Sequence, residues 1–340
     1  MKPETVMQSM LDAIETEMQA VLASEPTISP TFFAMLQYHM GWVNSDNTPS
    51  TNGQSGKRIR PLLCLLTCMA AGGDWQQAVP AAAAVELLHS FSLIHDDIQD
   101  QSPTRRGKAT VWKIWGAAQA INSGDAMLAY AHIAMSRLFE RGVDPALVVR
   151  ALRRLDETCI ELTKGQHADM SFETRDDVTL DEYMPMIERK TSVLVELCAE
   201  LGALIAGKDE ESIHHFAGFG LNLGLAFQVI DDILGIWGDE TVIGKSAATD
   251  IITRKKTIPV LYGLARHDDL RTLYQQPENH NGFVKQVIQL LDETGAREYA
   301  EKEAAAYSHN ALHHLESANP LPEGYSALHD MALKLLNRQA

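Results

Sequence analysis

The chain has 340 residues, 45% of them hydrophobic, which is enough apolar material for one large core or two ordinary ones. Its 29 lysines and arginines stand against 45 aspartates and glutamates, and the formal charge of −16 argues against general binding to nucleic acid or to anionic membrane surfaces. An anionic substrate therefore needs a local basic cluster or metal ions.

The N-terminal sequence MKPETVMQSMLDAIETEM is amphipathic and acidic. It lacks the basic start and the apolar stretch of a secretory or transit peptide, so we expect a cytoplasmic protein. The longest apolar run, residues 61–71, is shorter than the roughly 20 residues that cross a bilayer, and no membrane span is expected. The four cysteines lie among aliphatic residues outside any CxxC or Cys/His cluster, which favours plain core packing.

Apolar residues recur at three- and four-residue spacing along most of the chain, and we find no convincing stretch of strict alternation. This periodicity predicts an all-α protein. The clearest helical segments are 80–102, 119–140, 145–166, 188–206 and 210–234.

We expect a single domain over residues 1–340. It would consist of a helical N-terminal region (1–55), a core that carries the motifs (56–260) and C-terminal helices (261–340). The polar stretch at 44–56 is loop-like but does not resemble a linker between domains.

The helix predicted between Pro80 and Pro103 ends in the sequence DDIQD. On an ideal helix Asp96 and Asp100 lie within about 40° of each other and Asp97 flanks them, so the three carboxylates can share one side. Carboxylates gathered in this way suit Mg²⁺, which divides its coordination between protein oxygens, water and phosphate. The alternative is a solvated acidic helix end.

A second aspartate cluster, Asp231 and Asp232, lies in the mostly apolar segment AFQVIDDILGIWGD. An unpaired charge pair would be costly to bury in such a segment, so these carboxylates need partners. If the two aspartate-bearing helices face each other, bridging Mg²⁺ ions can hold a diphosphate from both sides. That arrangement would stabilise departing pyrophosphate.

Basic residues accompany both clusters, and arginine matches phosphate oxygens with a planar fork of donors while lysine supplies a mobile point charge. They are Lys57, Arg58 and Arg60 in GKRIRP, Arg105 and Arg106 in RRG, and Lys190, Lys245, Lys255 and Lys256. Taken singly, each can also be part of a solvated surface. Together with the aspartates, they indicate a second diphosphate site that needs no metal.

The ordered motifs GKRIRP, ELLHSFSLIHDDIQD, RRG, INSGD, KGQHAD, KTS, FQVIDD and GKSAATDIITRKKTIP resemble those of the trans-isoprenyl diphosphate synthase (polyprenyl synthetase) family. The resemblance implies an isoprenoid-synthase-type helical bundle around a deep central cavity. It implies a homodimeric enzyme that uses two or three Mg²⁺ ions. This enzyme would condense isopentenyl diphosphate head to tail with dimethylallyl, geranyl or farnesyl diphosphate.

The resemblance also implies a role for each matching position. The metal ligands would be Asp96, Asp97, Asp100, Asp231 and Asp232. The allylic diphosphate would be held by Arg105, Lys190, Lys245 and Lys255, and the reaction site would be lined by Gln166, Thr191 and Gln228. The isopentenyl diphosphate pocket would be formed by Lys57, Arg60, His89 and Arg106. The catalytic residues among these would be Asp96, Asp97, Gln166, Lys190, Thr191, Asp231 and Lys245.

Two positions depart from the family pattern. Gly235 stands where the second cluster often has a third aspartate, and Asp239 can compensate if the helix continues past Gly238. Arg254 stands where many members have glycine. We expect activity to survive both changes.

Phe91, with Ser92 beside it, matches the positions that form the floor under the growing chain in this family. A large ring there implies a short product, most like that of geranylgeranyl diphosphate synthases. On an ideal helix Phe91 lies about 140° from Asp96, so the floor assignment rests on the resemblance and an ordinary core position is its alternative.

Three other functions stay open. A farnesyl or longer-chain synthase would share all the motifs. A class I terpene cyclase would use DDxxD but has no use for a second diphosphate pocket, and a non-catalytic partner subunit disagrees with the intact aspartate and lysine motifs.

Overall fold

A computed structural model describes residues 3–23, 30–50, 56–238, 249–276 and 282–336. These residues are helical almost throughout, which confirms the all-α prediction. The chain divides into two compact units, each assembled from three segments. The predicted boundaries at residues 55 and 260 stay a prediction.

The first unit comprises residues 1–159, 197–217 and 318–328. Its complete helices are α1 (Pro3–Leu22), α2 (Pro30–Met40), α3 (Ile59–Ala70), α4 (Val79–Gln99), α5 (Val111–Trp115) and α6 (Ala117–Ser136). A short 3₁₀ turn, Phe139–Arg141, follows α6.

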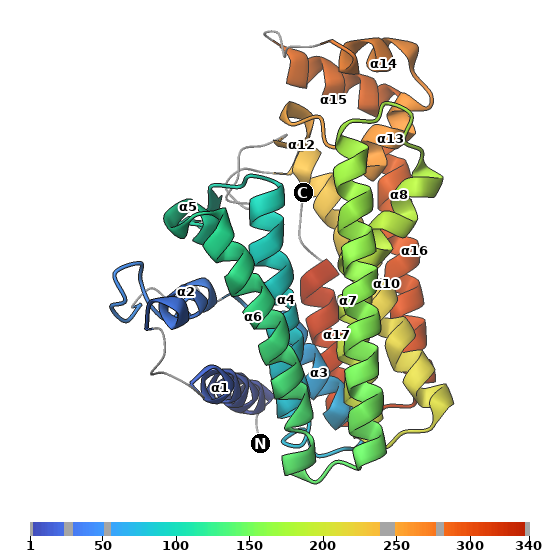
Figure 1. The fold of residues 1–340 in the computed structure, drawn as a ribbon. Helices are drawn as coiled ribbons and strands as arrows, with labels where there is room; N and C mark the ends of the chain where they lie inside the picture. The colour runs from blue at the N-terminus through green and yellow to red at the C-terminus, as the bar shows by residue number, and fades with distance from the viewer. Residues whose placement is uncertain (1–2, 24–29, 51–55, 239–248, 277–281, 337–340) are drawn as a thin grey trace. The chain divides into compact units, whose positions relative to one another are not determined.

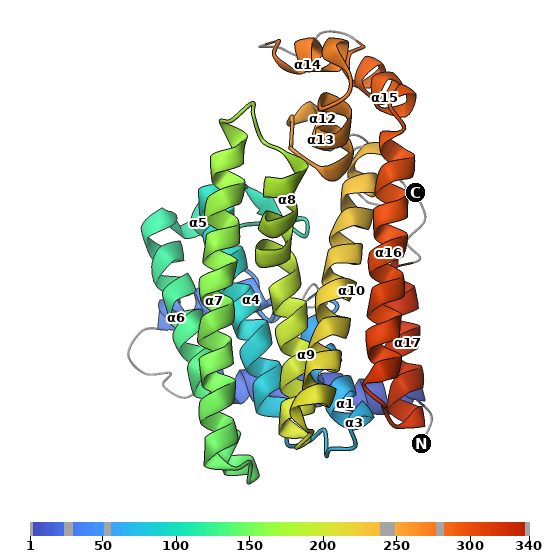
Figure 2. The same ribbon diagram turned by 90° about the vertical axis from the view of Figure 1, so that its right-hand side faces the viewer.

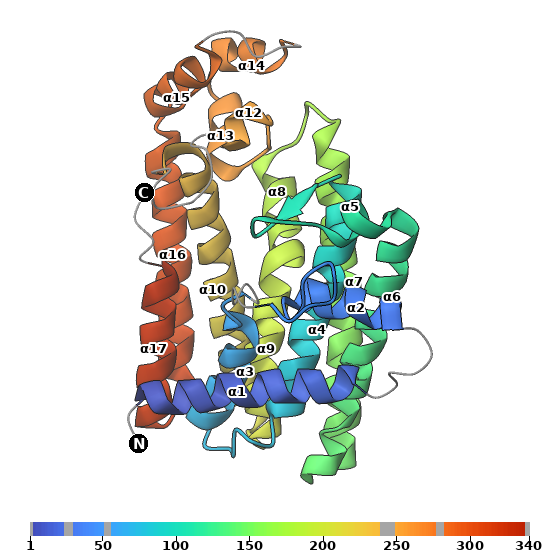
Figure 3. The same ribbon diagram turned by 90° about the vertical axis from the view of Figure 1, so that its left-hand side faces the viewer.

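Helix α4 is the centre of this unit. It lies beside α6, and α1 and α3 also contact it (Figures 1 and 3). The alanines from Ala81 to Ala84 are fully buried, because small side chains let neighbouring helices approach closely. Gly124 of α6 serves the same purpose, since a Cβ atom there would lie 2.2 Å from the Nε2 atom of His95.

A short hairpin follows α4, although no strand was expected from the sequence. Its strands β1 (Thr104–Arg105) and β2 (Lys108–Ala109) pair antiparallel. Arg106 and Gly107 form the turn with φ values of 52° and 75°, the pair of positive φ angles that a type I′ turn requires. Two-residue strands are too short to leave an alternating pattern.

The second unit comprises residues 160–196, 218–317 and 329–340. Its complete helices are α8 (Leu180–Ile187), α12 (Thr249–Ile252), α13 (Ile258–Leu264), α14 (Asp268–Tyr274), α15 (Phe283–Glu293) and α16 (Ala296–Ser317). Helix α13 lies against α16 (Figure 2). A π-helical turn, Glu188–Ser192, follows α8 directly.

Four helices contribute residues to both units: α7 (Pro145–Glu173), α9 (Val193–Ile205), α10 (Glu210–Trp237) and α17 (Pro322–Leu336). Within the described residues, α10 is the one helix whose length and composition would suit a membrane span. Its most apolar window is 61% buried inside the protein, as expected of a core helix. Helix α10 ends at Trp237, and Asp239 lies outside the described residues, so its compensating role stays a prediction.

Candidate active site

The first aspartate cluster lies at the C-terminal end of α4. Asp96 is half-buried, Asp97 is only 3% exposed, and Asp100 is an exposed residue at the helix cap. The Asp100 N–H donates to the Asp96 carbonyl oxygen at 2.8 Å, so the helical repeat persists through the cluster. The three residues of one motif therefore have three different environments.

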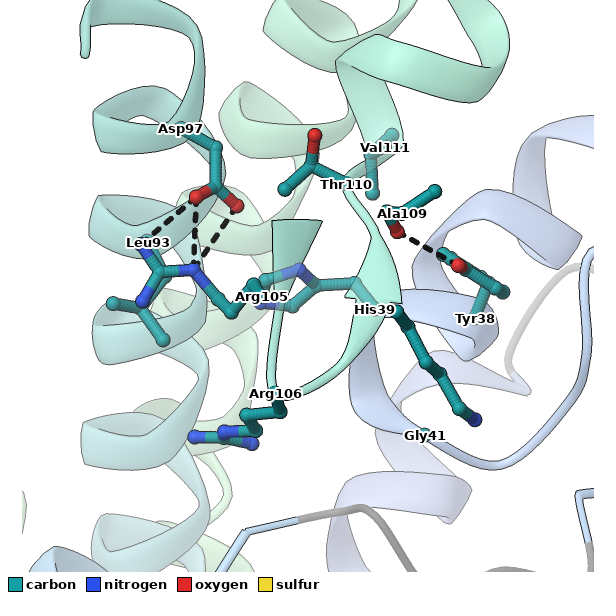
Figure 4. A pocket seen from close by; sticks show the side chains of 11 residues that line it. Tyr38, His39, Gly41, Leu93, Asp97, Arg105, Arg106, Ala109, Thr110 and Val111 are labelled. Carbon is teal, nitrogen blue, oxygen red and sulfur yellow. Dashed lines mark hydrogen bonds and ion pairs between the residues drawn. The ribbon is translucent and has the colours of Figure 1, made fainter. Parts of the chain in front are cut away.

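Asp97 is bound by Arg105 of the hairpin. The Arg105 Nε atom lies 2.9 Å and 3.1 Å from the two carboxylate oxygens, and Nη2 lies 2.8 Å from Oδ1 (Figure 4). Burial raises the pKa of Asp97, and the guanidinium opposes that shift. Asp97, expected from the resemblance to bind metal, and Arg105, expected to hold the allylic diphosphate, thus bind each other in this structure.

Arg106 extends to a different partner. A Cβ atom at Gly56 would lie 2.6–2.9 Å from atoms of the Arg106 guanidinium, so a side chain there would push the guanidinium out of this contact. Gly56 directly precedes Lys57, and its φ of 82° also favours glycine. The hairpin turn therefore brings RRG next to GKRIRP within the first unit.

A pocket in this unit is lined by the end of α2, by α4 and by the hairpin (Figure 4). Its lining includes the cationic side chains Arg105, Arg106 and Lys108 and one carboxylate, Asp97. Burial and the neighbouring arginines lower the pKa of His39, which also lines the pocket, to about 3. With His39 neutral, positive charge still predominates in the pocket, which suits an anion.

Arg60 and His89 form a second contact of the predicted isopentenyl diphosphate pocket. The Arg60 Nη1 atom lies 3.3 Å from the His89 Nε2 atom. Burial and then the charges of Arg60 and Arg106 lower the pKa of His89 well below its ordinary value. A neutral His89 can accept a hydrogen bond from the guanidinium, which can only donate.

Arg58, which sequence analysis left without a role, links four elements of the first unit. Its guanidinium lies 2.6 Å from Glu86 of α4 and 3.3 Å from Glu15 of α1, and it donates to the Met40 carbonyl oxygen of α2 at 3.3 Å. Arg58 is 7% exposed and stands immediately before α3 in the left-handed backbone region. It therefore fixes the backbone that carries Lys57 and Arg60.

In the second unit, Lys190 and Thr191 lie on the π-helical turn. Two glycines allow neighbouring helices to approach that turn: a Cβ atom at Gly165 of α7 would lie 2.4 Å from the Lys190 nitrogen, and one at Gly224 of α10 would lie 2.8 Å from the Ser192 Cα. π-Helical turns occur frequently at functional sites. The glycine of KGQHAD is thus required by packing against the KTS motif.

Asp232 is fully engaged by hydrogen bonds. It is 1% exposed, and its oxygens accept from the Tyr183 hydroxyl (2.8 Å), the Gln228 amide (3.0 Å) and the Ile258 N–H (3.2 Å). Gln228 in turn accepts from the Thr191 hydroxyl at 3.0 Å. Burial raises the pKa of Asp232 to about 6. The metal role of Asp232 stays a prediction, and its observed contacts are those of a residue that orients Gln228.

Lysines of this unit lie among carboxylates. The Lys190 ammonium forms an ion pair with Asp169 of α7. Loss of hydration lowers the pKa of Lys255, but four carboxylates raise it by more, namely those of Asp232, Asp250, Asp169 and Asp231. Gln166 is buried on α7, and Lys245 lies outside the described residues.

Phe91 is 8% exposed and packs edge-on against His95, with ring centroids 4.8 Å apart. His95 in turn lies against Gly124 of α6. Ser92 is half-buried, and its hydroxyl donates to the His89 carbonyl oxygen at 2.9 Å. The floor role of Phe91 and Ser92 stays a prediction.

Several residues of the site had no role in the sequence analysis. Asp169 lies within KGQHAD and Asp250 within the last motif, so both could have been singled out by position. Glu86 opens the motif ELLHSFSLIHDDIQD and could also have been singled out, whereas Tyr183 lies outside every motif and carried no signal. Arg254 takes a φ of 55°, which explains why glycine is common there, and its guanidinium donates to the Tyr274 carbonyl oxygen at 2.9 Å.

The sequence model of the polyprenyl synthetase family matches residues 46–291. A geranylgeranyl diphosphate synthase of Mycobacterium tuberculosis is 43% identical over 247 residues, which cover 72% of this chain and 69% of that protein. A (2E,6E)-farnesyl diphosphate synthase of the same species is 40% identical over 281 residues, 82% of this chain and 73% of that protein. The crystal structure of a polyprenyl synthetase from Streptomyces coelicolor superposes with a TM-score of 0.88 at 31% identity, covering 98% of this chain and 99% of that one.

The residues matched by the family model include every motif described above, from Gly56 to Pro259. They agree with the helical fold described above. The chain belongs to the polyprenyl synthetase family, whose members are prenyltransferases that use a divalent metal ion.

Proposed function

We propose that this protein condenses isopentenyl diphosphate with an allylic diphosphate and releases a geranylgeranyl diphosphate product. The observation that carries the proposal is the contact between Gly56 and the Arg106 guanidinium. That contact joins GKRIRP to RRG, so basic residues of both motifs gather beside the Asp97–Arg105 pair. A synthase needs two diphosphate sites, whereas a terpene cyclase needs one.

The donor set fits Mg²⁺ held jointly by protein and substrate. Among the described residues, no group of three or more His, Cys, Asp or Glu side chains is gathered so as to hold a metal ion alone. Mg²⁺ commonly completes its shell with water and substrate phosphate oxygens. Asp96 and Asp100 of α4 and Asp231 of α10 would hold two or three such ions, which would supply positive charge to the leaving diphosphate.

The protein's own residues would act on both substrates. Arg105, Lys190 and Lys255 would neutralise the allylic diphosphate as its bond to carbon breaks. The Thr191 hydroxyl and the Gln228 amide, already hydrogen-bonded to each other, would direct oxygen dipoles at the developing cation. Lys57, Arg60 and Arg106 would hold isopentenyl diphosphate, whose double bond attacks that cation before a proton is lost.

We also propose a cytoplasmic homodimer. Within the first unit, four large apolar side chains around α6 are exposed by 37–63%, a pattern typical of a surface covered by a partner: Ile114, Ile121, Ile133 and Phe139. A second copy of the chain would cover them.

The test is a condensation assay with labelled isopentenyl diphosphate and each of the three allylic primers. We expect condensation with Mg²⁺ and none with EDTA. Arg60→Ala should raise the KM for isopentenyl diphosphate without raising that for the primer. A cyclase would release hydrocarbon from the primer alone, and a non-catalytic subunit would release nothing; either result would contradict the proposal.

A further inference from the structure

The hairpin that carries Arg105 and Arg106 has strands of only two residues each. A two-stranded hairpin of this kind is marginally stable in water unless it packs against other elements. The Arg105 side chain is held by the buried carboxylate of Asp97. Arg106 lies in the turn, so its position depends on how the backbone of the hairpin is held.

Helix α2 supports the second strand of this hairpin through Tyr38. The Tyr38 hydroxyl donates to the Ala109 carbonyl oxygen at 2.7 Å (Figure 4). Ala109 pairs with Thr104, the residue before Arg105, so the hydrogen bond fixes the strand that leads away from the turn. The Tyr38 ring is 8% exposed and packs edge-on against Trp115 of α5, with ring centroids 5.2 Å apart. The packing of the ring thus directs the hydroxyl at the hairpin.

The same helix is bound to the other basic motif two residues further on. The Met40 carbonyl oxygen accepts from the Arg58 guanidinium at 3.3 Å, and the Met40 sulfur accepts from the Ser90 hydroxyl of α4 at 3.3 Å. Arg58 belongs to GKRIRP and stands two residues before Arg60. One short stretch of α2 is therefore attached to GKRIRP through Met40 and to the RRG hairpin through Tyr38.

We propose that Tyr38 is a positioning residue for the isopentenyl diphosphate site, because its hydroxyl holds the hairpin in the place that brings the Arg106 guanidinium beside Gly56. Tyr38 lies outside every motif of the chain. The inference rests on the proposed function, since it matters only if Arg106 binds isopentenyl diphosphate. Arg105 depends less on Tyr38, because Asp97 holds it separately. Loss of the Tyr38 hydroxyl should therefore affect one substrate more than the other.

The test is Tyr38→Phe in the full-length protein, which keeps the ring and removes the hydrogen bond. Steady-state condensation assays should show a KM for isopentenyl diphosphate about fivefold higher, the effect of one hydrogen bond lost, with kcat and the KM for the allylic primer within twofold of the wild type. Tyr307→Phe in α16 is the matched control. Its ring packs against an apolar cluster, its hydroxyl has no hydrogen bond within the part of the chain that the structure describes, and all three constants should stay within twofold.

A double-mutant cycle makes the test specific to Arg106. Arg106→Ala alone should raise the KM for isopentenyl diphosphate at least tenfold. If Tyr38 acts by positioning the Arg106 guanidinium, adding Tyr38→Phe to Arg106→Ala should change that KM less than twofold further, because residues that act as a unit are not additive. A tyrosine that only stabilised the fold would produce the same fivefold increase with and without Arg106.

Two results would overturn the inference while leaving the function intact: a wild-type KM for isopentenyl diphosphate in Tyr38→Phe, or a fivefold increase that persists in the Arg106→Ala background. Thermal unfolding and circular dichroism would establish that the variants are folded. If the wild type itself neither bound isopentenyl diphosphate nor condensed it with any primer, the proposed function would fail together with the inference.

Discussion

Arg105 holds Asp97 with two of its nitrogen atoms, Nε at 2.9 Å and Nη2 at 2.8 Å from the same carboxylate oxygen. The carboxylate is 4% exposed and the arginine side chain 32% exposed. The pair couples the end of α4 to the RRG hairpin, so the position of both arginines of that motif depends on one buried aspartate.

Arg105→Ala should lower the free energy of unfolding by about 2 kcal/mol, because it leaves the buried Asp97 charge without its cation. Adding Asp97→Asn should recover most of this loss, since a neutral amide costs less to bury. Urea denaturation of the two variants measures both effects. A double variant as unstable as Arg105→Ala would show that the arginine stabilises the protein through other contacts.

Arg58→Ala should destabilise the protein by about 3 kcal/mol, because Glu86 is 4% exposed and would keep a buried charge. Arg153→Ala is the control: that side chain is 78% exposed in an i,i+4 pair, and its loss should cost about 0.5 kcal/mol or less. Urea denaturation of Arg58→Ala and Arg153→Ala measures the two losses of stability. Equal losses would contradict the role of Arg58 as the link between α1, α2 and α4.

Gly56→Ala should raise the KM for isopentenyl diphosphate about tenfold, because the new methyl group displaces the Arg106 guanidinium. Gly142→Ala tests backbone strain alone, since Gly142 has a similar φ of 78° and nothing within 4 Å of its Cβ position. Both variants should lose about 1 kcal/mol of stability. If Gly56→Ala kept the wild-type KM for isopentenyl diphosphate, the contact between Gly56 and Arg106 would not contribute to the binding of that substrate.

Asp232 should make stability depend on pH. Its pKa of about 6 in the folded protein exceeds the ordinary 3.8, so the unfolded chain loses this proton first as pH rises. The contribution of Asp232 is therefore most favourable below about pH 4 and declines until about pH 6.

Asp232→Asn removes this titration. The asparagine side chain can keep its contacts with Tyr183 and Gln228 if the side-chain amide of Gln228 flips. The stability of the variant relative to the wild type should rise by about 2 kcal/mol between pH 4.5 and 7. Urea denaturation with EDTA at each pH gives the comparison. A constant difference would contradict the raised pKa of Asp232.

The sequence predicted the fold class and the motifs well, because helical periodicity and the spacing of charged residues are local. The helix predicted over 80–102 is observed as Val79–Gln99, with Asp100 as its cap. What the motifs could not give is the environment of each residue. Asp97 and Asp232 are each the second aspartate of a pair, yet both are buried, Asp97 against Arg105 of the hairpin and Asp232 against Tyr183, 49 residues away in the sequence.

Tyr38 illustrates the same limit. Its hydrogen bond to Ala109 joins α2 to the hairpin, and no periodicity in the sequence encodes that contact. Arg58 likewise forms ion pairs with Glu15 and with Glu86, which lie far from it in the sequence. From the sequence, Arg58 could be identified only as a basic residue of the motif GKRIRP.

Product chain length tests the central claim most directly. Purified protein would be incubated with Mg²⁺, labelled isopentenyl diphosphate and dimethylallyl, geranyl or farnesyl diphosphate, and the dephosphorylated alcohols would be separated by chromatography. The account predicts a twenty-carbon product from all three primers, and longer products from Phe91→Ala if that ring is the floor. Products that end at fifteen carbons or extend to twenty-five or more in the wild type would contradict the assigned product, and the absence of condensation with every primer would contradict the function itself.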